Sequence, residues 1–168
     1  TMSVLSSIRC AVLSLVNVCF ISEKTDIVIF RDSISSVEID RLYQDFDAED
    51  NDNLYEVQIE AKSSDRFKIR YWPLGKHDSY KEGWVEKRHC GVFLRSNGYT
   101  SDGHSYINIY TSSRTIEHIR IYDMWDMPVQ VIDYFKSGRR LKVSIPIGNV
   151  TVVGWIERFC PYIYNSCT

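Results

Sequence analysis

Apolar and polar residues alternate along most of the chain, which is the pattern of strands with one buried face. Two segments read as strand, polar turn, strand: VQIEAKSSDRFKIRYW (57–72) and VQVIDYFKSGRRLKVSIP (129–146). Serine, aspartate or glycine stands at each tip, as is typical of β-hairpins. The pattern predicts a mainly β fold that contains two hairpins.

The same order of elements occurs twice. Upstream of the hairpins, IVIFRDSISS (27–36) and INIYTSSRTI (107–116) are alternating strands that run into serine-rich turns. Downstream stand two nearly identical phrases, GWVEKRHC (83–90) and GWIERFC (154–160). One small chain rarely contains two copies of a catalytic site, whereas a strand that closes a repeated fold often occurs twice. We therefore interpret the phrases as parts of a repeated fold.

The period of the repeat indicates its architecture. Trp84 and Trp155 are 71 residues apart, which is too long for a solenoid and suits two tandem small barrels. We expect one barrel over 1–91, with an N-terminal strand extension, and the second over 92–168. In each phrase, glycine permits a bend or bulge, and the tryptophan is predicted to pack on the core.

Other segments add little helix. The apolar run around Val12–Ile21 is predicted to be a buried strand, since it is shorter than the roughly 20 residues that a membrane-spanning helix needs. The best helical candidate is SSVEIDRLYQDF (35–46), which begins with serine caps. We expect at most one short helix.

Composition fits an ordinary globular protein, with 44% hydrophobic, 25% charged and 13% aromatic residues. The net charge of −2 provides no bulk attraction to nucleic acid or to an anionic membrane. Residues 1–90 hold 16 acids and 12 bases, a net −4, while residues 91–168 hold 6 acids and 8 bases, a net +2. The two halves therefore present different surfaces.

The cysteines favour a disulfide over a metal site. The chain contains no CxxC and no HxxxH pair, so a zinc site is poorly supported. Cys160 and Cys167 frame a short terminal loop, CPYIYNSC, and we predict that they form a disulfide. The pairing of Cys10, Cys19 and Cys90 stays open, and two unpaired terminal thiols are the alternative.

A strand with a serine-rich turn, a hairpin that ends in FKI or LKV, and then GWV or GWI resembles the bacterial SH3-like domain. Phe67 and Leu141 stand where that family often has tryptophan. The tail GWIERFCPYIYNSCT resembles exported proteins of Gram-negative bacteria, by its cysteine framing only. The resemblance covers most of 27–168 and implies a binding role in the periplasm or cell envelope, without catalytic residues on these strands.

Two arrangements could carry chemistry. His89 and Cys90 are adjacent, but neighbours on a strand point to opposite faces, so we do not expect a cysteine nucleophile. In DFDAEDNDNLYE (45–56), acids occupy several positions of a calcium loop, but its central glycine is replaced by Asp50. A solvated acidic loop is the simpler interpretation, and calcium stays an alternative.

Aromatic residues offer a better binding surface. Trp125, in the loop-like stretch DMWDMP, is the first choice for an exposed anchor. Arg139 and Arg140, at the second hairpin tip, are interpreted as a solvated turn, with a patch for an acidic partner as the alternative. The complete predicted binding set is Trp125, Met124, Met127, Tyr122, Tyr110 and Tyr99.

We therefore expect a non-catalytic binding protein of the cell envelope that engages a protein partner or peptidoglycan. The alternative is an immunity-type protein that neutralises a toxin by direct binding, for which the acidic first half would oppose a basic toxin. An enzyme is the least supported class. We expect no cofactor, no metal, no nucleic-acid partner and no membrane insertion.

Overall fold

The computed structural model describes residues 15–47, 54–124, 126–135 and 139–161, and in them the chain is all-β. The only helical elements in these ranges are the short 3-10 turns η2 (His77–Ser79) and η3 (Lys87–His89). No helix in the described part of the chain is long and apolar enough to cross a membrane. The predicted all-β class is confirmed.

The strands follow the alternating segments of the sequence closely. The first half contributes β1 (Val16–Phe20), β2 (Asp26–Phe30), β3 (Glu38–Tyr43), β4 (Tyr55–Lys62), β5 (Arg66–Pro73), β6 (Lys81–Glu86) and β7 (Cys90–Leu94). The second half contributes β8 (Gly98–Tyr99), β9 (Ser105–Tyr110), β10 (His118–Tyr122), β11 (Pro128–Tyr134), β12 (Leu141–Ile147), β13 (Val150–Ile156) and β14 (Phe159–Cys160).

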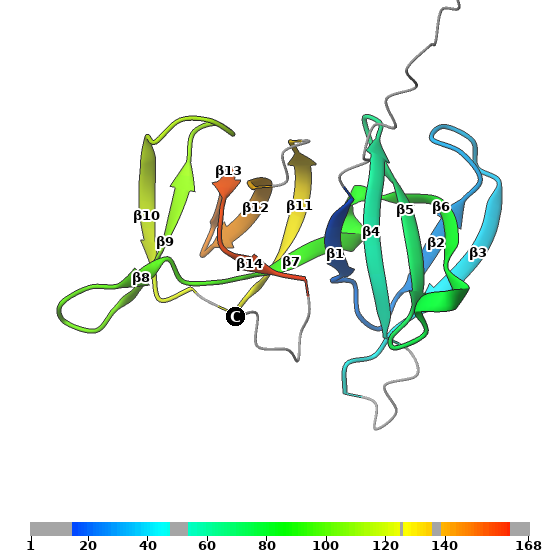
Figure 1. Ribbon diagram of the computed structural model, residues 1–168, viewed down its shortest axis with the longest axis horizontal. Helices are drawn as coiled ribbons and strands as arrows, with labels where there is room; N and C mark the ends of the chain where they lie inside the picture. Colours follow the sequence, from blue (N-terminus) through cyan, green and yellow to red (C-terminus); the bar gives the residue numbers. More distant parts are fainter. Residues whose placement is uncertain (1–14, 48–53, 125, 136–138, 162–168) are drawn as a thin grey trace, which may run out of the picture.

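All these strands join one antiparallel sheet, which in the described residues is not closed into a barrel, so the two closed barrels predicted from the sequence are not found there. Its order is β10-β9-β13-β12-β11-β7-β1-β4-β5-β6-β2-β3, with β14 beside β7 and β8 beside β9. The sequence β3-β2-β6-β5-β4 in the first half is matched by β10-β9-β13-β12-β11 in the second. The two halves lie side by side, and β7 crosses from one to the other (Figure 1).

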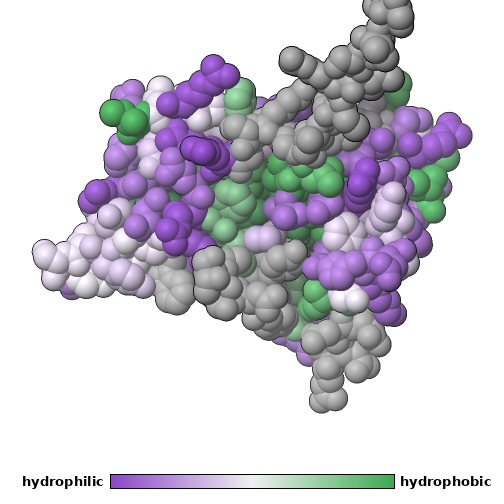
Figure 2. All heavy atoms as spheres, viewed as in Figure 1, coloured by the Kyte–Doolittle hydropathy of each residue, from purple (hydrophilic) through white to green (hydrophobic). Residues whose placement is uncertain are grey.

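Strand β7 belongs to both halves of the sheet. It pairs with β1 through Cys90, which lies opposite Phe20, and with β11 through Val92, which lies opposite Val129. The predicted boundary between residues 91 and 92 falls inside this strand. A single cluster of buried side chains extends through both halves. On the visible face, hydrophobic residues gather mainly between the halves, and hydrophilic residues cover most of the rest (Figure 2).

Two predicted elements have clear outcomes. The strand expected within Val12–Ile21 is present as β1 and pairs with β4 and β7, while residues 12–14 lie outside the described part. The prediction of a helix over 35–46 is wrong. The centre of this segment is strand β3, which pairs with residues Asp26–Phe30 of β2. Leu42 of β3 is buried in the core, and pairing with β2 outweighs the weak helical pattern.

Candidate binding surface

The two GW phrases occupy equivalent strands, as predicted, but their tryptophans do not fill the core. Trp84 of β6 lies opposite Lys68 of β5, and Trp155 of β13 lies opposite Lys142 of β12. Both tryptophans are half-buried, whereas the next residues, Val85 and Ile156, have no exposed surface. The prediction that the tryptophan packs on the core was therefore wrong.

Glycine explains why the tryptophans face outward. A Cβ atom on Gly83 would lie 2.3 Å from Cγ2 of Ile29, and one on Gly154 would lie 2.3 Å from Cγ2 of Ile109. Neither position has room for a side chain on the core face. Alternation along the strand then turns the following tryptophan to the opposite face. The glycine thus serves close packing between strands.

An aromatic side chain flanks each tryptophan on this outer face. Trp84 is registered with Phe30 of β2, and Trp155 is registered with Tyr110 of β9. Each half therefore carries a row of lysine, tryptophan and a second ring across neighbouring strands. The two rows differ in the residue on the next strand. Phe30 lies opposite Glu38 of β3, whereas Tyr110 lies opposite His118 of β10.

An arginine at each hairpin fixes the serine-rich turn beside this row. Nη1 of Arg66 donates to the carbonyl oxygens of Asp32 (2.9 Å) and Ser35 (2.7 Å), and its guanidinium lies 3.7 Å from the Phe30 ring centroid. The second half repeats the arrangement through Arg140, whose Nη1 donates to the carbonyl oxygens of Ser112 (3.0 Å) and Thr115 (2.5 Å).

Arg140 was predicted to lie in a solvated turn, and the structure corrects this. Its side chain is only 11% exposed, and its guanidinium lies 3.6 Å from the Tyr110 ring centroid. Its Nη2 pairs with Glu157 at 2.8 Å. The neighbouring Arg139 is exposed. The repeated motif of serine, two residues, arginine and an apolar residue, in SSDRF and SGRRL, could have revealed this role from sequence.

The outer surface of β9 and β10, hereafter the β9–β10 face, gathers Tyr106, Tyr110, His118, Arg120 and Tyr122. The Arg120 guanidinium lies 4.1 Å from the Tyr106 ring centroid, and the His118 and Tyr110 rings lie 5.3 Å apart. Tyr122 is 50% exposed, whereas Tyr110 is 9% exposed under Arg140. Exposed aromatic and cationic groups thus share one surface.

Tyr99, Met124 and Met127, which were also predicted to bind, lie around this face rather than on it. Tyr99 is 67% exposed, but it is registered with the buried Ser105, whose side chain alternates to the other side of β9. Met124 and Met127 are partly buried and pack against the core. Trp125 lies outside the described residues, so its role as an anchor stays a prediction.

Tyr122 also lines a groove of 410 Å³ beside the β9–β10 face. His104 Nδ1 lies 2.8 Å from the Asp123 carboxylate in this groove. Asp123 has a positive φ of 56°, which marks a tight turn after β10. The groove walls are Thr100, Asp102, His104, Tyr122 and Asp123.

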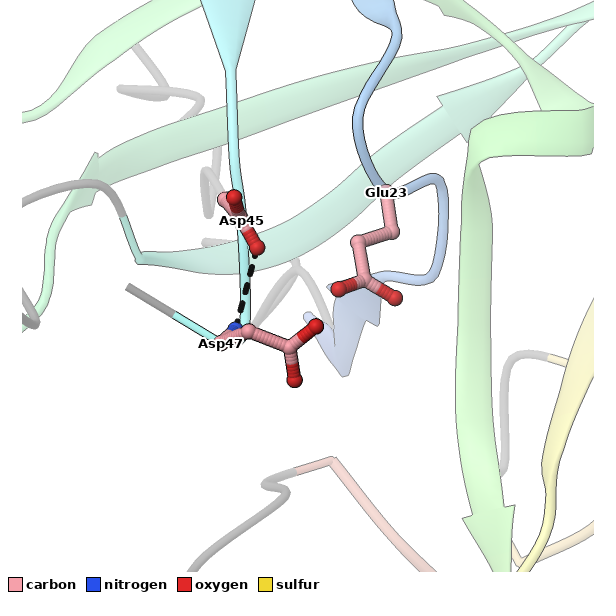
Figure 3. A group of neighbouring side chains, drawn as sticks. All are labelled: Glu23, Asp45 and Asp47. Atoms are coloured by element: carbon pink, nitrogen blue, oxygen red, sulfur yellow. Dashed lines mark hydrogen bonds between the residues drawn. The ribbon is translucent and has the colours of Figure 1, made fainter. Parts of the chain in front are cut away.

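Three carboxylates from the first half form an acidic cluster (Figure 3). Oxygen atoms of Glu23, Asp45 and Asp47 lie within 4.8 Å of one another. Asp45 accepts a hydrogen bond from the backbone N–H of Asp47 at 3.0 Å. Such oxygens suit a hard cation. However, Lys24 already pairs with Asp47 at 2.9 Å and with Asp45 at 3.8 Å.

The calcium-loop alternative would use Glu56 together with Asp45 and Asp47, but Glu56 is not a member of this cluster. Glu56 lies in β4, is 8% exposed and accepts a hydrogen bond from Nε1 of Trp72. Residues 48–53, which include Glu49 and Asp50, lie outside the described part. The acidic cluster is therefore a different set from the predicted loop, with only Asp45 and Asp47 in common.

His89 ends the 3-10 turn η3, and Cys90 begins strand β7. His89 is 2% exposed, and its Nδ1 lies 2.6 Å from Oγ of Ser22. Cys90 belongs to the core cluster, where burial raises the pKa of its thiol far above the ordinary value. Burial likewise raises the pKa of the free thiol of Cys19 to about 12. Both thiols are therefore held in their unreactive protonated forms.

The predicted disulfide between Cys160 and Cys167 lies only partly within the described residues. Cys160 is fully buried beside Cys19 and Phe93, whereas Cys167 lies outside the described residues. The bridge stays a prediction.

Comparison with known proteins adds no relative to this picture. No protein-family model, no curated protein and no solved structure matches this chain. The surface itself must therefore support any statement about function.

Proposed function

We propose that this chain is a non-catalytic binding protein with two SH3-like units that engages a protein partner through the β9–β10 face. The repeated strand order and the repeated arginine contacts support two related units. The envelope location rests on the resemblance and on cysteine framing, and remains a prediction.

The observation that carries the binding role is the asymmetry between equivalent surfaces. Registers place Arg41 and Tyr43 of β3 where Arg120 and Tyr122 lie in β10. Arg41 donates to Glu38 at 2.7 Å and to Asp26 at 2.8 Å, so its charge is used within the first half. Arg120 instead stacks on Tyr106, and no ion pair to a carboxylate is present for it among the described residues.

An exposed cation on an aromatic surface is suited to a partner that supplies carboxylates and apolar groups. Aromatic and arginine side chains give large contact area and dominate many protein interfaces. The net charge of +2 over residues 91–168 has the appropriate sign. A protein partner with an acidic surface therefore fits the β9–β10 face.

The experiment uses the repeat as its own control. Tyr122 and Tyr43 are equivalent and are 50% and 48% exposed. Immobilised protein is incubated with a Gram-negative envelope extract and, separately, with purified cell-wall sacculi. We expect the immobilised protein to capture one partner protein in a stoichiometric amount. Tyr122→Ala should lower the captured amount at least about tenfold, whereas Tyr43→Ala should leave it unchanged. Equal retention by both variants, or sedimentation with sacculi alone, would reject the proposed protein-binding face.

A second candidate function is toxin neutralisation through the first half. The acidic cluster of Glu23, Asp45 and Asp47 is the observation that favours it, because a basic toxin surface would complement it. In the same experiment, a basic partner that Tyr122→Ala retains and Asp47→Lys releases would support this candidate.

A further inference from the structure

We propose that β10 is an acceptor strand: its free edge binds an extended, acidic segment of the protein partner as an added β-strand. This inference rests on the proposed binding function and specifies the form of the partner. Strand addition joins two chains through main-chain hydrogen bonds, while alternate side chains determine which segment fits. β10 ends the sheet order, and no strand in the described part of the chain pairs with its other edge.

The hydrogen bonds around β10 identify the backbone groups at this edge. Asp123 N–H donates to Ser105 O at 3.0 Å, and Thr111 N–H donates to Glu117 O at 3.2 Å. In an antiparallel pair, directly bonded residues occur at every second position. Ile119 and Ile121 therefore bond to β9, and the three intervening residues direct their N–H and C=O groups outward. These three are His118, Arg120 and Tyr122.

The edge of β10 carries the charge of Arg120 and is five residues long, but it lacks other features that protect edge strands. It contains no proline, no acidic residue and no register shift. Ile119 is 55% exposed, and Ile116 in the preceding turn is 89% exposed. Natural proteins usually blunt such edges with bulges, charges or short strands, because an open apolar edge invites pairing.

The equivalent strand β3, at the other end of the sheet, is protected. Its pairing with β2 shifts register between Ile29 and Phe30. Asp40 accepts hydrogen bonds from Tyr71 Oη at 2.7 Å and from Lys81 Nζ at 3.0 Å, which draws its charge inward. The chain therefore protects one end of its sheet and leaves the other open.

Charge selects an acidic occupant over a second copy of this chain. A two-fold pairing of whole β10 strands would set Arg120 opposite the same arginine of the other copy, which is repulsive. A strand that alternates acidic and apolar residues would instead place carboxylates near Arg120 and His118. Its apolar residues would cover Ile119.

The first test measures amide hydrogen exchange by NMR in the full chain. In the free protein, we expect fast exchange at His118, Arg120 and Tyr122 and slow exchange at Ile119 and Ile121. The probe is a synthetic peptide that alternates glutamate with valine. Saturation with it should slow the three fast amides at least about tenfold, whereas a peptide with lysine in place of glutamate should not. Unchanged amides, or equal protection by both peptides, would overturn the proposal.

The second test removes one outward N–H. Arg120→Pro deletes a donor that β9 does not use, and proline is tolerated on edge strands. Arg120→Ala keeps the donor and removes the side chain, with its charge and its contact with the Tyr106 ring. We expect the proline variant to lose peptide binding by at least about tenfold more than the alanine variant. Equal losses would indicate a contact through the side chain alone and would overturn strand addition.

Two further outcomes are distinguishable. If the proline variant melts early, the exchange measurement on the unmodified protein decides the question. If the three amides become protected with rising protein concentration alone, a second copy occupies the edge, and the proposal is wrong. Failure here leaves the proposed function intact when Tyr122→Ala still releases the captured protein.

Discussion

At the residue scale, glycine determines which face each neighbouring side chain occupies. The phrase GWVE has apolar residues at consecutive positions, so alternation alone does not say whether tryptophan or valine faces the core. Close approach of Ile29 to Gly83 and of Ile109 to Gly154 decides this in both halves. The repeat and its strands could be predicted because alternation is local. The face could not, because it depends on contacts between strands that are distant in the sequence.

This placement predicts unequal costs for two adjacent truncations. Val85→Ala should lower the free energy of unfolding by about 2 kcal/mol, because it opens a cavity at a fully buried position. Trp84→Ala should cost about 1 kcal/mol, since the ring is half-exposed and leaves no enclosed cavity. Denaturant titration of both variants tests the order. A larger cost for Trp84→Ala would mean that the tryptophan is a core residue.

At the element scale, the arginine contacts connect each hairpin to its serine-rich turn. The two turns differ in the residue that accepts the turn's backbone N–H groups. The Asp32 carboxylate accepts from Ser35 N–H at 2.6 Å and from Ile34 N–H at 3.0 Å, whereas Ser112 Oγ does so in the second half. The serine-rich composition predicted the turns, but the arginine partner was missed because it lies over thirty residues away in the first half.

The arginine contact predicts a strict requirement for guanidinium. Arg140→Lys should lower the free energy of unfolding by about 1–3 kcal/mol, because a compact ammonium does not reproduce the planar guanidinium that reaches both carbonyl oxygens and Glu157. Arg139→Lys is the matched control and should have no measurable effect, since Arg139 is exposed. Equal melting of the two variants in a thermal scan would contradict the assigned contacts.

The turn in the first half also predicts a difference in acid stability. Hydrogen bonds from the N–H groups of Ser35 and Ile34 lower the pKa of Asp32 to about 2. Its folded pKa is below the unfolded value of about 3.9, so this stabilisation is present above that value and is lost as pH falls to about 2. Asp32→Ser, which copies the second half, should therefore lose less stability than the natural protein between about pH 4 and 2. Equal losses in urea titrations across this window would contradict the shifted pKa.

At the scale of the whole molecule, the halves are joined by one strand and one core. The aromatic rings of Phe67 and Tyr134 lie 6.2 Å apart across the junction, and Lys62 donates to the Tyr134 carbonyl at 3.2 Å. Lys62 also pairs with Asp133. Sequence reasoning predicted the repeat but not this junction, because no local pattern shows that β7 serves both halves.

A shared strand and core predict that the halves unfold together. Denaturant unfolding should give one transition with the same midpoint for tryptophan fluorescence and for far-ultraviolet circular dichroism. The Val143→Ala variant, in the core of the second half, should shift both signals equally. Two separated transitions would show that each half is stable without the other.

The central claim is that function is located on the β9–β10 face, at one end of an otherwise symmetric repeat. The most direct measurement is NMR mapping of backbone amides in the full chain as the captured protein partner is titrated. We predict that the largest shifts occur at residues 106–110 and 118–122, with small changes at the equivalent residues 26–30 and 38–43. Shifts centred on Glu23, Asp45 and Asp47 would contradict the claim and support the acidic cluster instead.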